Sequence, residues 1–98
     1  MIKEVSSIKD IQDKQFLIKY GQEFCIPCEM TENSMKEIES NYEGLPFYSC
    51  KNVDESISKG FTNLPVIELH KVDEVITLTD SSVMMNAEEL KGWIDSND

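Results

Sequence analysis

At residues 16–44 the chain reads FLIKYGQEFCIPCEMTENSMKEIESNYEG, and this segment contains the strongest structural signals of the sequence. Its first five residues, Phe16–Tyr20, are mostly apolar, as expected for a buried central strand. A short loop follows and leads into Cys25-Ile26-Pro27-Cys28. From there the apolar residues recur every three to five positions, which is typical of a helix, and Gly44 ends the pattern. The stretch therefore predicts a strand, a loop, and a helix with two cysteines at its start.

Outward from this stretch, strands alternate with helices along the chain. Apolar runs and turn residues predict an edge strand over 2–5, a short helix after Ser6-Ser7, strands over 47–50, 64–69 and 75–78, and helices over 52–58 and after Asn86. Such alternation is typical of parallel βαβ units, whereas the last two strands, which a turn joins, predict an antiparallel hairpin. We therefore expect an α/β protein whose central mixed sheet of about four to five strands has helices on both faces.

Length and charge narrow the class of protein. The chain has 98 residues, which is the size of one domain over residues 1–98. Nine Lys and Arg against 19 Asp and Glu give a net charge of −10, which argues against nucleic acids and anionic membrane surfaces as partners. No segment approaches about 18 consecutive apolar residues, and residues 1–5 lack the apolar region of a signal peptide. We therefore expect a cytoplasmic protein.

The cysteine pair provides the functional signal, because three cysteines do not suit a secreted disulfide framework. A Cys-x-x-Cys that follows a strand and opens a helix within a βαβ pattern is typical of thioredoxin-like redox proteins. The chain resembles thioredoxins along nearly its full length, with Met30, Ile38, Tyr42 and Gly44 where thioredoxins have similar residues. The segment GFTNLP at 60–65 resembles the family's Gly-aliphatic-x-x-aliphatic-Pro segment, whose proline is cis. The resemblance implies a thioredoxin-like fold and a thiol-disulfide oxidoreductase that acts in electron transport and cell redox homeostasis.

Several positions depart from the usual thioredoxin pattern. Phe24 replaces the Trp before the first cysteine, and Ile26-Pro27 replaces Gly-Pro between the cysteines. Asn33 replaces the proline that kinks the helix, and Lys19 replaces the buried acid of the central strand. The glycine after the last strand has no clear counterpart. Because Pro27 lies directly before the second cysteine, the motif favours a thioredoxin over a glutaredoxin.

The positions of the two cysteines predict their roles. A thiolate is the nucleophile in disulfide exchange, and a helix N-terminus stabilises it. Cys25 lies before the first helical turn, so we expect it to be the nucleophile and the more exposed cysteine. Cys28 lies one turn later, so we expect it to be more buried and to resolve the mixed disulfide by attacking Cys25. Pro27 suits the first turn, since it has no N–H to leave unpaired.

Further residues are expected to support the site. The resemblance implies that Leu64 offers its backbone to an extended substrate and that Pro65 lies beside the cysteines, although a proline that opens a strand can simply mark an edge. Phe24 is either an aromatic wall beside Cys25 or a core residue. Lys19 takes the place of an acid that, in thioredoxins, lies under the cysteines and relays a proton to the buried thiol. Its amine could stabilise a thiolate as an ammonium, accept the proton as a neutral amine, or extend to solvent.

The resemblance also implies partners. We expect disulfide-containing proteins as substrates and a thioredoxin-reductase-like protein or a small thiol as the electron donor. We expect no tightly bound cofactor, no metal, and a monomer. Two other functions stay open: a glutaredoxin-like reductase that depends on glutathione, and a thioredoxin-fold binding module without catalysis.

The remaining reactive residues have structural interpretations. Cys25, Cys28, Cys50 and His70 could together bind zinc, but they do not form the two close pairs that zinc sites usually have. Cys50 is expected to be an apolar core residue on its strand, with a regulatory thiol as the alternative. His70 follows a strand and is expected to be exposed. The charged residues over 29–39 are expected to form a solvated helix face.

Overall fold

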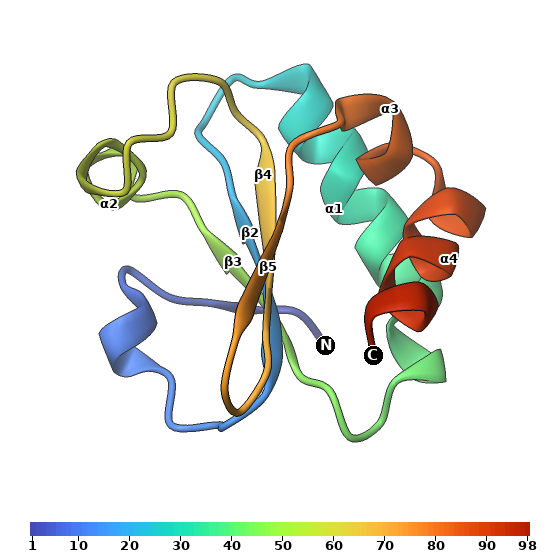
Figure 1. Ribbon diagram of the computed structural model, residues 1–98. Coiled ribbons are helices and arrows are strands. Elements are labelled where there is room, and N and C mark those ends of the chain that lie inside the picture. The colour runs from blue at the N-terminus through green and yellow to red at the C-terminus, as the bar shows by residue number, and fades with distance from the viewer.

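The structure is a computed structural model that describes residues 1–98. Its centre is a sheet of five strands in the order β1-β3-β2-β4-β5 (Figure 1). The strands are β1 (Lys3–Glu4), β2 (Phe16–Tyr20), β3 (Phe47–Cys50), β4 (Val66–His70) and β5 (Val75–Leu78). β1, β3 and β2 are parallel, whereas β4 is antiparallel to β2 and β5 is antiparallel to β4. The predicted mixed sheet with a hairpin at its end is confirmed.

Helices cover both faces of this sheet, as the sequence predicts (Figure 1). One face carries α1 (Ile26–Ile38), α3 (Ser81–Met84) and α4 (Ala87–Asn97), and the other carries α2 (Val53–Ser58) and the 3-10 helix η1 (Ile8–Asp10). A second 3-10 helix, η2 (Glu39–Asn41), follows α1. None of the helices has the length and apolar character needed to cross a membrane. The sheet is therefore the middle of three layers.

The alternation of side chains along β2 divides the core into two clusters. Leu17 lies in the larger cluster, 11 buried residues that include Met35 of α1. Ile18 and Tyr20 lie in the smaller cluster of six buried residues, on the face that α2 and η1 cover. Lys19 shares the face of Leu17 and therefore points toward α1. The one charged residue of β2 is thus directed at the helix that carries the cysteines.

Two element boundaries differ from the sequence-based expectation by two residues or more, and others differ by one. α1 ends at Ile38 and the chain continues as η2, so the expected continuous helix up to Gly44 is wrong at its end. β4 begins at Val66, two residues after Leu64, because Pro65 has no N–H to donate to the ladder. Both differences fall at the ends of elements, and neither changes the order of strands and helices.

The chain between β5 and α4 contains a helix that the sequence pattern does not predict. α3 has four residues, too few for a helical period to be recognised. Its N-cap residue is Asp80, whose carboxylate accepts a hydrogen bond from the Ser82 N–H at 3.0 Å. The next helix, α4, begins as predicted at Asn86, whose side-chain oxygen accepts from the Glu89 N–H at 3.1 Å. Polar side chains therefore mark the starts of both helices.

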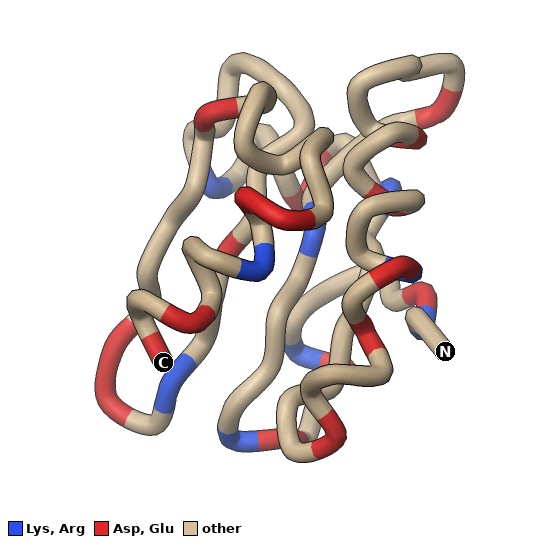
Figure 2. Tube along the Cα trace, turned by 90° about the vertical axis from the view of Figure 1, so that its right-hand side faces the viewer, with Lys and Arg blue, Asp and Glu red and all other residues tan.

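Acidic residues are distributed over the whole molecule. Figure 2 shows Asp and Glu in helices and loops throughout the trace, with fewer Lys between them. Some carboxylates form ion pairs, such as Glu4 with Lys51 at 3.2 Å and Asp95 with Lys91 at 3.0 Å. With 19 acidic and nine basic residues, most carboxylates have no cation beside them. The protein therefore presents a negative surface to its partners.

Candidate active site

The site lies where β2 ends and α1 begins. Cys25 is the N-cap residue of α1, with an extended backbone (φ −122°, ψ 103°), and its Sγ accepts a hydrogen bond from the Cys28 N–H at 3.3 Å. The Cys25 carbonyl oxygen accepts the first helical hydrogen bond, from the Glu29 N–H at 3.1 Å. Pro27 lies in the first turn, where N–H groups have no partner within the helix. The sulfur of Cys25 is therefore at the positive end of the helix, where a thiolate is stabilised.

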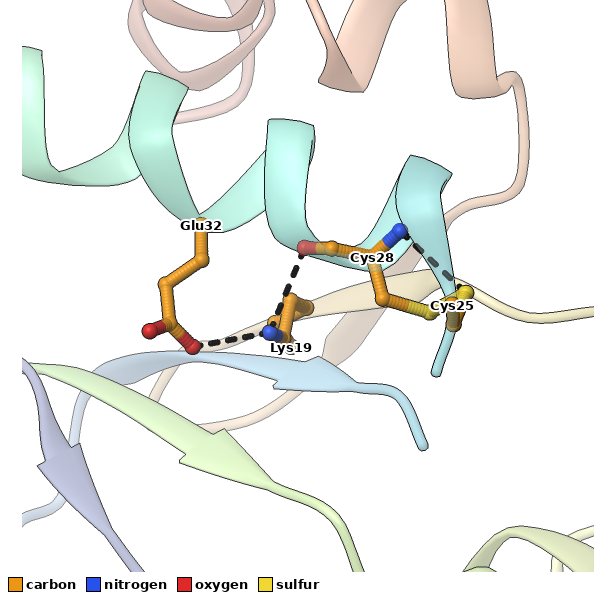
Figure 3. The surroundings of a disulfide bond; sticks show 4 residues. All are labelled: Lys19, Cys25, Cys28 and Glu32. Carbon is orange, nitrogen blue, oxygen red and sulfur yellow. Dashed lines mark hydrogen bonds and ion pairs between the residues drawn. A yellow bond between two sulfur atoms is a disulfide. The ribbon is translucent and has the colours of Figure 1, made fainter. Parts of the chain in front are cut away.

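Cys25 and Cys28 form a disulfide bond, with their Cα atoms 5.2 Å apart (Figure 3). Cys28 is only 2% exposed, whereas Cys25 is half-buried and reaches the surface. The expected order of exposure is confirmed. A disulfide in this position can accept two electrons, and Cys25 is the sulfur that an external thiol can reach.

Lys19 lies in the core beside this disulfide (Figure 3). Its residue is 1% exposed, so the interpretation that its side chain extends to solvent is wrong. The ammonium donates hydrogen bonds to Glu32 Oε1 at 2.8 Å and to the Cys28 carbonyl oxygen at 3.4 Å. A buried cation is stable when an anion pairs with it, and Glu32 provides that anion. Lys19 therefore belongs to the site together with an acidic partner.

Glu32 is a site residue whose role local sequence patterns do not indicate. It was expected on a solvated face of the helix, but its side chain is 22% exposed and points to Lys19 (Figure 3). Burial acts to raise the pKa of Glu32, but the hydrogen bond and the charge of Lys19 outweigh it and hold the pKa below its usual value. A signal was present in the sequence, since Glu32 lies four residues after Cys28 and therefore on the same side of the helix.

Gly21 allows the end of β2 to approach the cysteines closely. A Cβ at this position would lie 3.2 Å from Cys28 Cβ, 3.3 Å from Cys28 Sγ and 3.4 Å from Lys19 Cε. Any larger residue would therefore press against the disulfide. The sequence pattern did not single out Gly21, because a glycine after a strand is also typical of an ordinary turn.

Exposed apolar side chains flank Cys25 in the chain. Phe24 is 99% exposed and Ile26 is 69% exposed. The interpretation of Phe24 as a core residue is therefore wrong, whereas its role as an aromatic wall stays a prediction. The backbone of Phe24 has a φ of +55°, in the left-handed region that residues other than glycine rarely adopt. The loop thus presents a large aromatic side chain to solvent next to the accessible sulfur.

The segment before β4 lies at the same end of the sheet as the start of α1 (Figure 1). In the sheet register, Val66 at the start of β4 is opposite Tyr20 at the end of β2. The Leu64–Pro65 peptide bond is cis, as the resemblance implies, and Pro65 is buried. Neither the N–H nor the C=O of Leu64 forms a backbone hydrogen bond within the chain. Two backbone groups are therefore free at this end of the sheet.

A cleft of about 460 Å³ opens beside Cys28. Phe24 and Cys28 are its two apolar lining residues, and the rest of the lining is polar and mostly charged, with both signs present. The charged lining residues are Lys19, Lys36, Lys51, Glu23, Glu29 and Glu32. The buried Lys19–Glu32 pair is therefore connected to a polar hollow at the surface.

The four residues considered as zinc ligands do not come together. Cys50 pairs with Tyr20 at one end of β2, whereas His70 pairs with Phe16 at the other end. Cys50 also belongs to the smaller core cluster, on the opposite face of the sheet from α1 and Cys28. No group of three or more His, Cys, Asp or Glu side chains is arranged to hold a metal ion. The zinc interpretation is therefore wrong.

Cys50 and His70 are instead parts of the packing around the smaller cluster. Cys50 is fully buried, as predicted; burial raises the pKa of its thiol, and the Glu55 carboxylate adds to this. The expectation that His70 is exposed is wrong, since its side chain is 14% exposed and its ring stacks on Phe16 with 4.3 Å between centroids. Its Nε2 lies 2.7 Å from Glu68 Oε1. A buried carboxylate is stable only when polar groups pair with it, and this contact with Glu68 keeps His70 packed against the sheet.

No protein-family model matches the chain, and no curated protein matches its sequence significantly. Solved structures of thioredoxins match its fold over nearly its whole length. Thioredoxin from Plasmodium falciparum is 21% identical with a TM-score of 0.78, over 99% of this chain and 100% of that chain. The oxidized mitochondrial thioredoxin 3 of Saccharomyces cerevisiae is 20% identical with a TM-score of 0.76, over 97% and 94%. Fasciola hepatica thioredoxin is 11% identical with a TM-score of 0.76, over 99% and 100%. The chain therefore has the thioredoxin fold.

Proposed function

We propose that this chain is a thiol-disulfide oxidoreductase that reduces protein disulfides through Cys25 and Cys28. The observation that carries the proposal is the disulfide at the first turn of α1, in which Cys25 reaches the surface while Cys28 is 2% exposed. Such a disulfide can exchange with an external thiol, because one sulfur is accessible and the helix N-terminus stabilises its thiolate. The thioredoxin fold supports the same assignment by analogy.

In the proposed cycle, the Cys25 thiolate of the reduced protein attacks one sulfur of a substrate disulfide. The substrate S–S bond breaks, its first thiolate leaves and takes a proton from solvent, and a Cys25–substrate disulfide forms. Cys28 then loses its proton and attacks Cys25 Sγ, which releases the second substrate thiolate and closes the Cys25–Cys28 bond. The substrate gains two electrons and the protein loses two. The Cys28 N–H, 3.3 Å from Cys25 Sγ, is positioned to stabilise the Cys25 thiolate that attacks the substrate.

The proposed substrate site lies between Phe24 and Leu64. The free N–H and C=O of Leu64 suit an extended peptide that binds by strand addition, with Pro65 buried directly after it. The exposed side chains of Phe24 and Ile26 offer apolar surface on the other side of Cys25. Substrates are therefore proposed to be proteins whose disulfide lies in an extended, accessible segment.

The proposal includes an electron donor and a compartment. A thioredoxin-reductase-like protein or a small thiol would reopen the Cys25–Cys28 bond and supply two electrons, and this exchange requires no cofactor bound to the chain. We propose that residues 1–98 act as one domain and as a monomer. The cytoplasm is the proposed compartment, because its thiol pools keep such a pair reduced.

Insulin reduction with dithiothreitol tests the proposed function. The wild type should accelerate precipitation of the insulin B chain relative to dithiothreitol alone, and Cys25→Ser should lose this acceleration. Acceleration with glutathione and glutathione reductase, but not with a thioredoxin reductase, would instead indicate a glutaredoxin-like protein. No acceleration with any donor would contradict catalysis and leave a binding module.

A further inference from the structure

The Lys19–Glu32 ion pair touches the cysteine-bearing helix at two successive turns. The Lys19 ammonium donates to Glu32 Oε1 at 2.8 Å and to the Cys28 carbonyl oxygen at 3.4 Å (Figure 3). A Cβ atom placed on Gly21 would lie 3.4 Å from Lys19 Cε and 3.3 Å from Cys28 Sγ. Lys19 Cε, which carries the ammonium, and the sulfur of Cys28 therefore border the same space beside Gly21.

Glu32 is the residue that can keep Lys19 charged. Burial disfavours the charged form of an amine, so a lysine that is 1% exposed needs an anion beside it to stay an ammonium. Glu32 is the only acid that forms an ion pair with Lys19. The two residues opposite Lys19 in the sheet, Ser49 and Ile67, carry no charge. The charge state of Lys19 therefore depends on Glu32.

The other charged groups that face this pair are at the surface. Lys36 Nζ lies 3.8 Å from Glu32 Oε2 and its side chain is 61% exposed, while Lys51 lines the same cleft and is 44% exposed. Glu23 and Glu29 line the cleft as exposed residues of opposite sign. Water and salt screen such charges, whereas a buried charge is screened much less. Lys19 is therefore the buried cation in contact with Cys28, whereas solvent screens the other two lysines.

We propose that Glu32 is a positioning residue for Cys28: it holds Lys19 as an ammonium beside the first turn of α1, and this ammonium stabilises the Cys28 thiolate once the disulfide is reduced. The inference rests on the proposed function, in which Cys28 must lose its proton before it attacks Cys25. Burial disfavours a thiolate, and a nearby cation offsets that effect. The ion pair thus speeds the second half of the cycle, and it argues against Lys19 as a neutral amine that accepts the proton.

The test is a titration of Cys28 that does not depend on turnover. In the reduced full chain carrying Cys25→Ser, carbon-13 NMR follows Cys28 Cβ and Lys19 Cε as the pH is raised. The compared chains carry in addition Lys19→Met, Glu32→Gln, or both substitutions. Glu29→Gln is the matched control, because it removes the same charge from the same cleft at a side chain without an ion pair to Lys19.

We expect Lys19→Met to raise the titration midpoint of Cys28 by about 1–2 pH units and Glu32→Gln to raise it by about 1, since an opposite charge within a few ångströms has effects of this size. In Glu32→Gln the midpoint of Lys19 should fall. Because Glu32 acts through Lys19, the double variant should give a Cys28 midpoint no higher than Lys19→Met. Glu29→Gln should leave both midpoints unchanged.

Three results would overturn the proposal: an unchanged Cys28 midpoint in Lys19→Met, an unchanged or lowered one in Glu32→Gln, or additive effects in the double variant. If Lys19→Met does not fold, the Lys19 and Cys28 midpoints of Glu32→Gln decide, since this substitution keeps the shape of a partly exposed side chain. The insulin assay of the wild type is separate. Its failure would contradict the proposed function, while the midpoints would still report the role of Glu32.

Discussion

Two cysteines are equally buried on opposite faces of one sheet, and their surroundings differ. Cys28 is 2% exposed and lies at the start of α1 beside the ammonium of Lys19, whereas Cys50 is 0% exposed in the smaller core, where burial and then the Glu55 carboxylate raise the pKa of its thiol. Gly21 adjoins both, since its N–H donates to the Cys50 carbonyl oxygen at 2.9 Å and its Cα faces Cys28. We therefore expect the helix terminus and the sign of the neighbouring charge, and not burial alone, to separate a reactive thiol from an inert one.

The largest difference between the two thiols is expected in turnover. Cys28→Ser leaves Cys25 able to attack but nothing to resolve the mixed disulfide, so insulin reduction should fall to the rate of dithiothreitol alone. A covalent adduct through Cys25 should accumulate and be visible by mass spectrometry. Cys50→Ala, the matched control on the other face, should turn over like the wild type. Equal adduct formation through Cys28 in Cys25→Ser would reverse the assigned roles.

A second difference is expected in alkylation. In the reduced native protein, Cys50 should react with iodoacetamide at least about 10²-fold more slowly than Cys25, because its thiol has a raised pKa and the reagent must wait for a local opening. Timed alkylation at pH 8 with peptide mass spectrometry measures each cysteine. In urea the rates should become similar. Fast alkylation of native Cys50 would instead favour the interpretation of this residue as a regulatory thiol.

The face of the sheet on which Cys50 lies also contains a buried charged residue, Glu68, whose partners differ from those of Lys19. Glu68 is 5% exposed, with His70 Nε2 at 2.7 Å and Lys59 Nζ at 3.4 Å. Burial acts to raise the pKa of Glu68, but the hydrogen bond to His70 and the charge of Lys59 hold it below its usual value. Because none of these partners lies on α1, we expect this charge to affect stability and not the cysteine pair.

Glu68→Gln should therefore lower the free energy of unfolding by about 1–3 kcal/mol near pH 7 and leave insulin reduction unchanged. Since the pKa of Glu68 is lowered in the folded state, its contribution is complete above the ordinary value of 4.5 and is lost as the pH falls through the folded-state pKa. The difference between wild type and variant should shrink toward pH 3. Urea unfolding at pH 7, 5 and 3 measures it, and a difference that is constant with pH would contradict the assignment.

The net charge of −10 is expected to have the smallest of these effects, a change in the rate at which charged substrates are reduced. Salt should speed the reduction of an acidic disulfide peptide and slow that of a basic one, each by a few-fold between about 20 and 300 mM, because it screens repulsion and attraction. Alkylation of Cys50 with neutral iodoacetamide is the control and should not respond. Salt-independent rates with both peptides would mean that charge does not select the partners of Cys25.

The strands could be predicted from the sequence because each is a local pattern. Phe16–Tyr20, Phe47–Cys50 and Val75–Leu78 have the predicted bounds, since each is a short apolar run between turn residues. α3 could not be predicted, because four residues do not complete a recognisable period. The end of α1 at Ile38 was missed since neither glycine nor proline marks it.

Within the candidate site, only the residues that belong to a local sequence motif could be predicted. Cys25, Cys28 and the face of Lys19 follow from spacing and strand alternation. Spacing places Glu32 on the same side of α1 as Cys28, but its pairing with Lys19 depends on which side of α1 packs on β2 and on how far its side chain extends. The burial of His70 likewise depends on a contact with another strand, because its ring stacks on Phe16 of β2. Contacts between elements are the part that local patterns do not contain.

Phe24 combines a left-handed backbone, φ +55°, with a side chain that is 99% exposed. A phenylalanine in this region is disfavoured by about 1 kcal/mol or more, and a fully exposed ring recovers none of that by packing. Asparagine or glycine would fit the same backbone better. Selection in the laboratory for heat resistance alone should therefore discard this ring early, whereas selection for reductase activity should retain it. With Phe24 as the proposed substrate contact, we expect stability and substrate binding to compete in the loop before Cys25, so a stabilised variant that keeps its activity should keep Phe24.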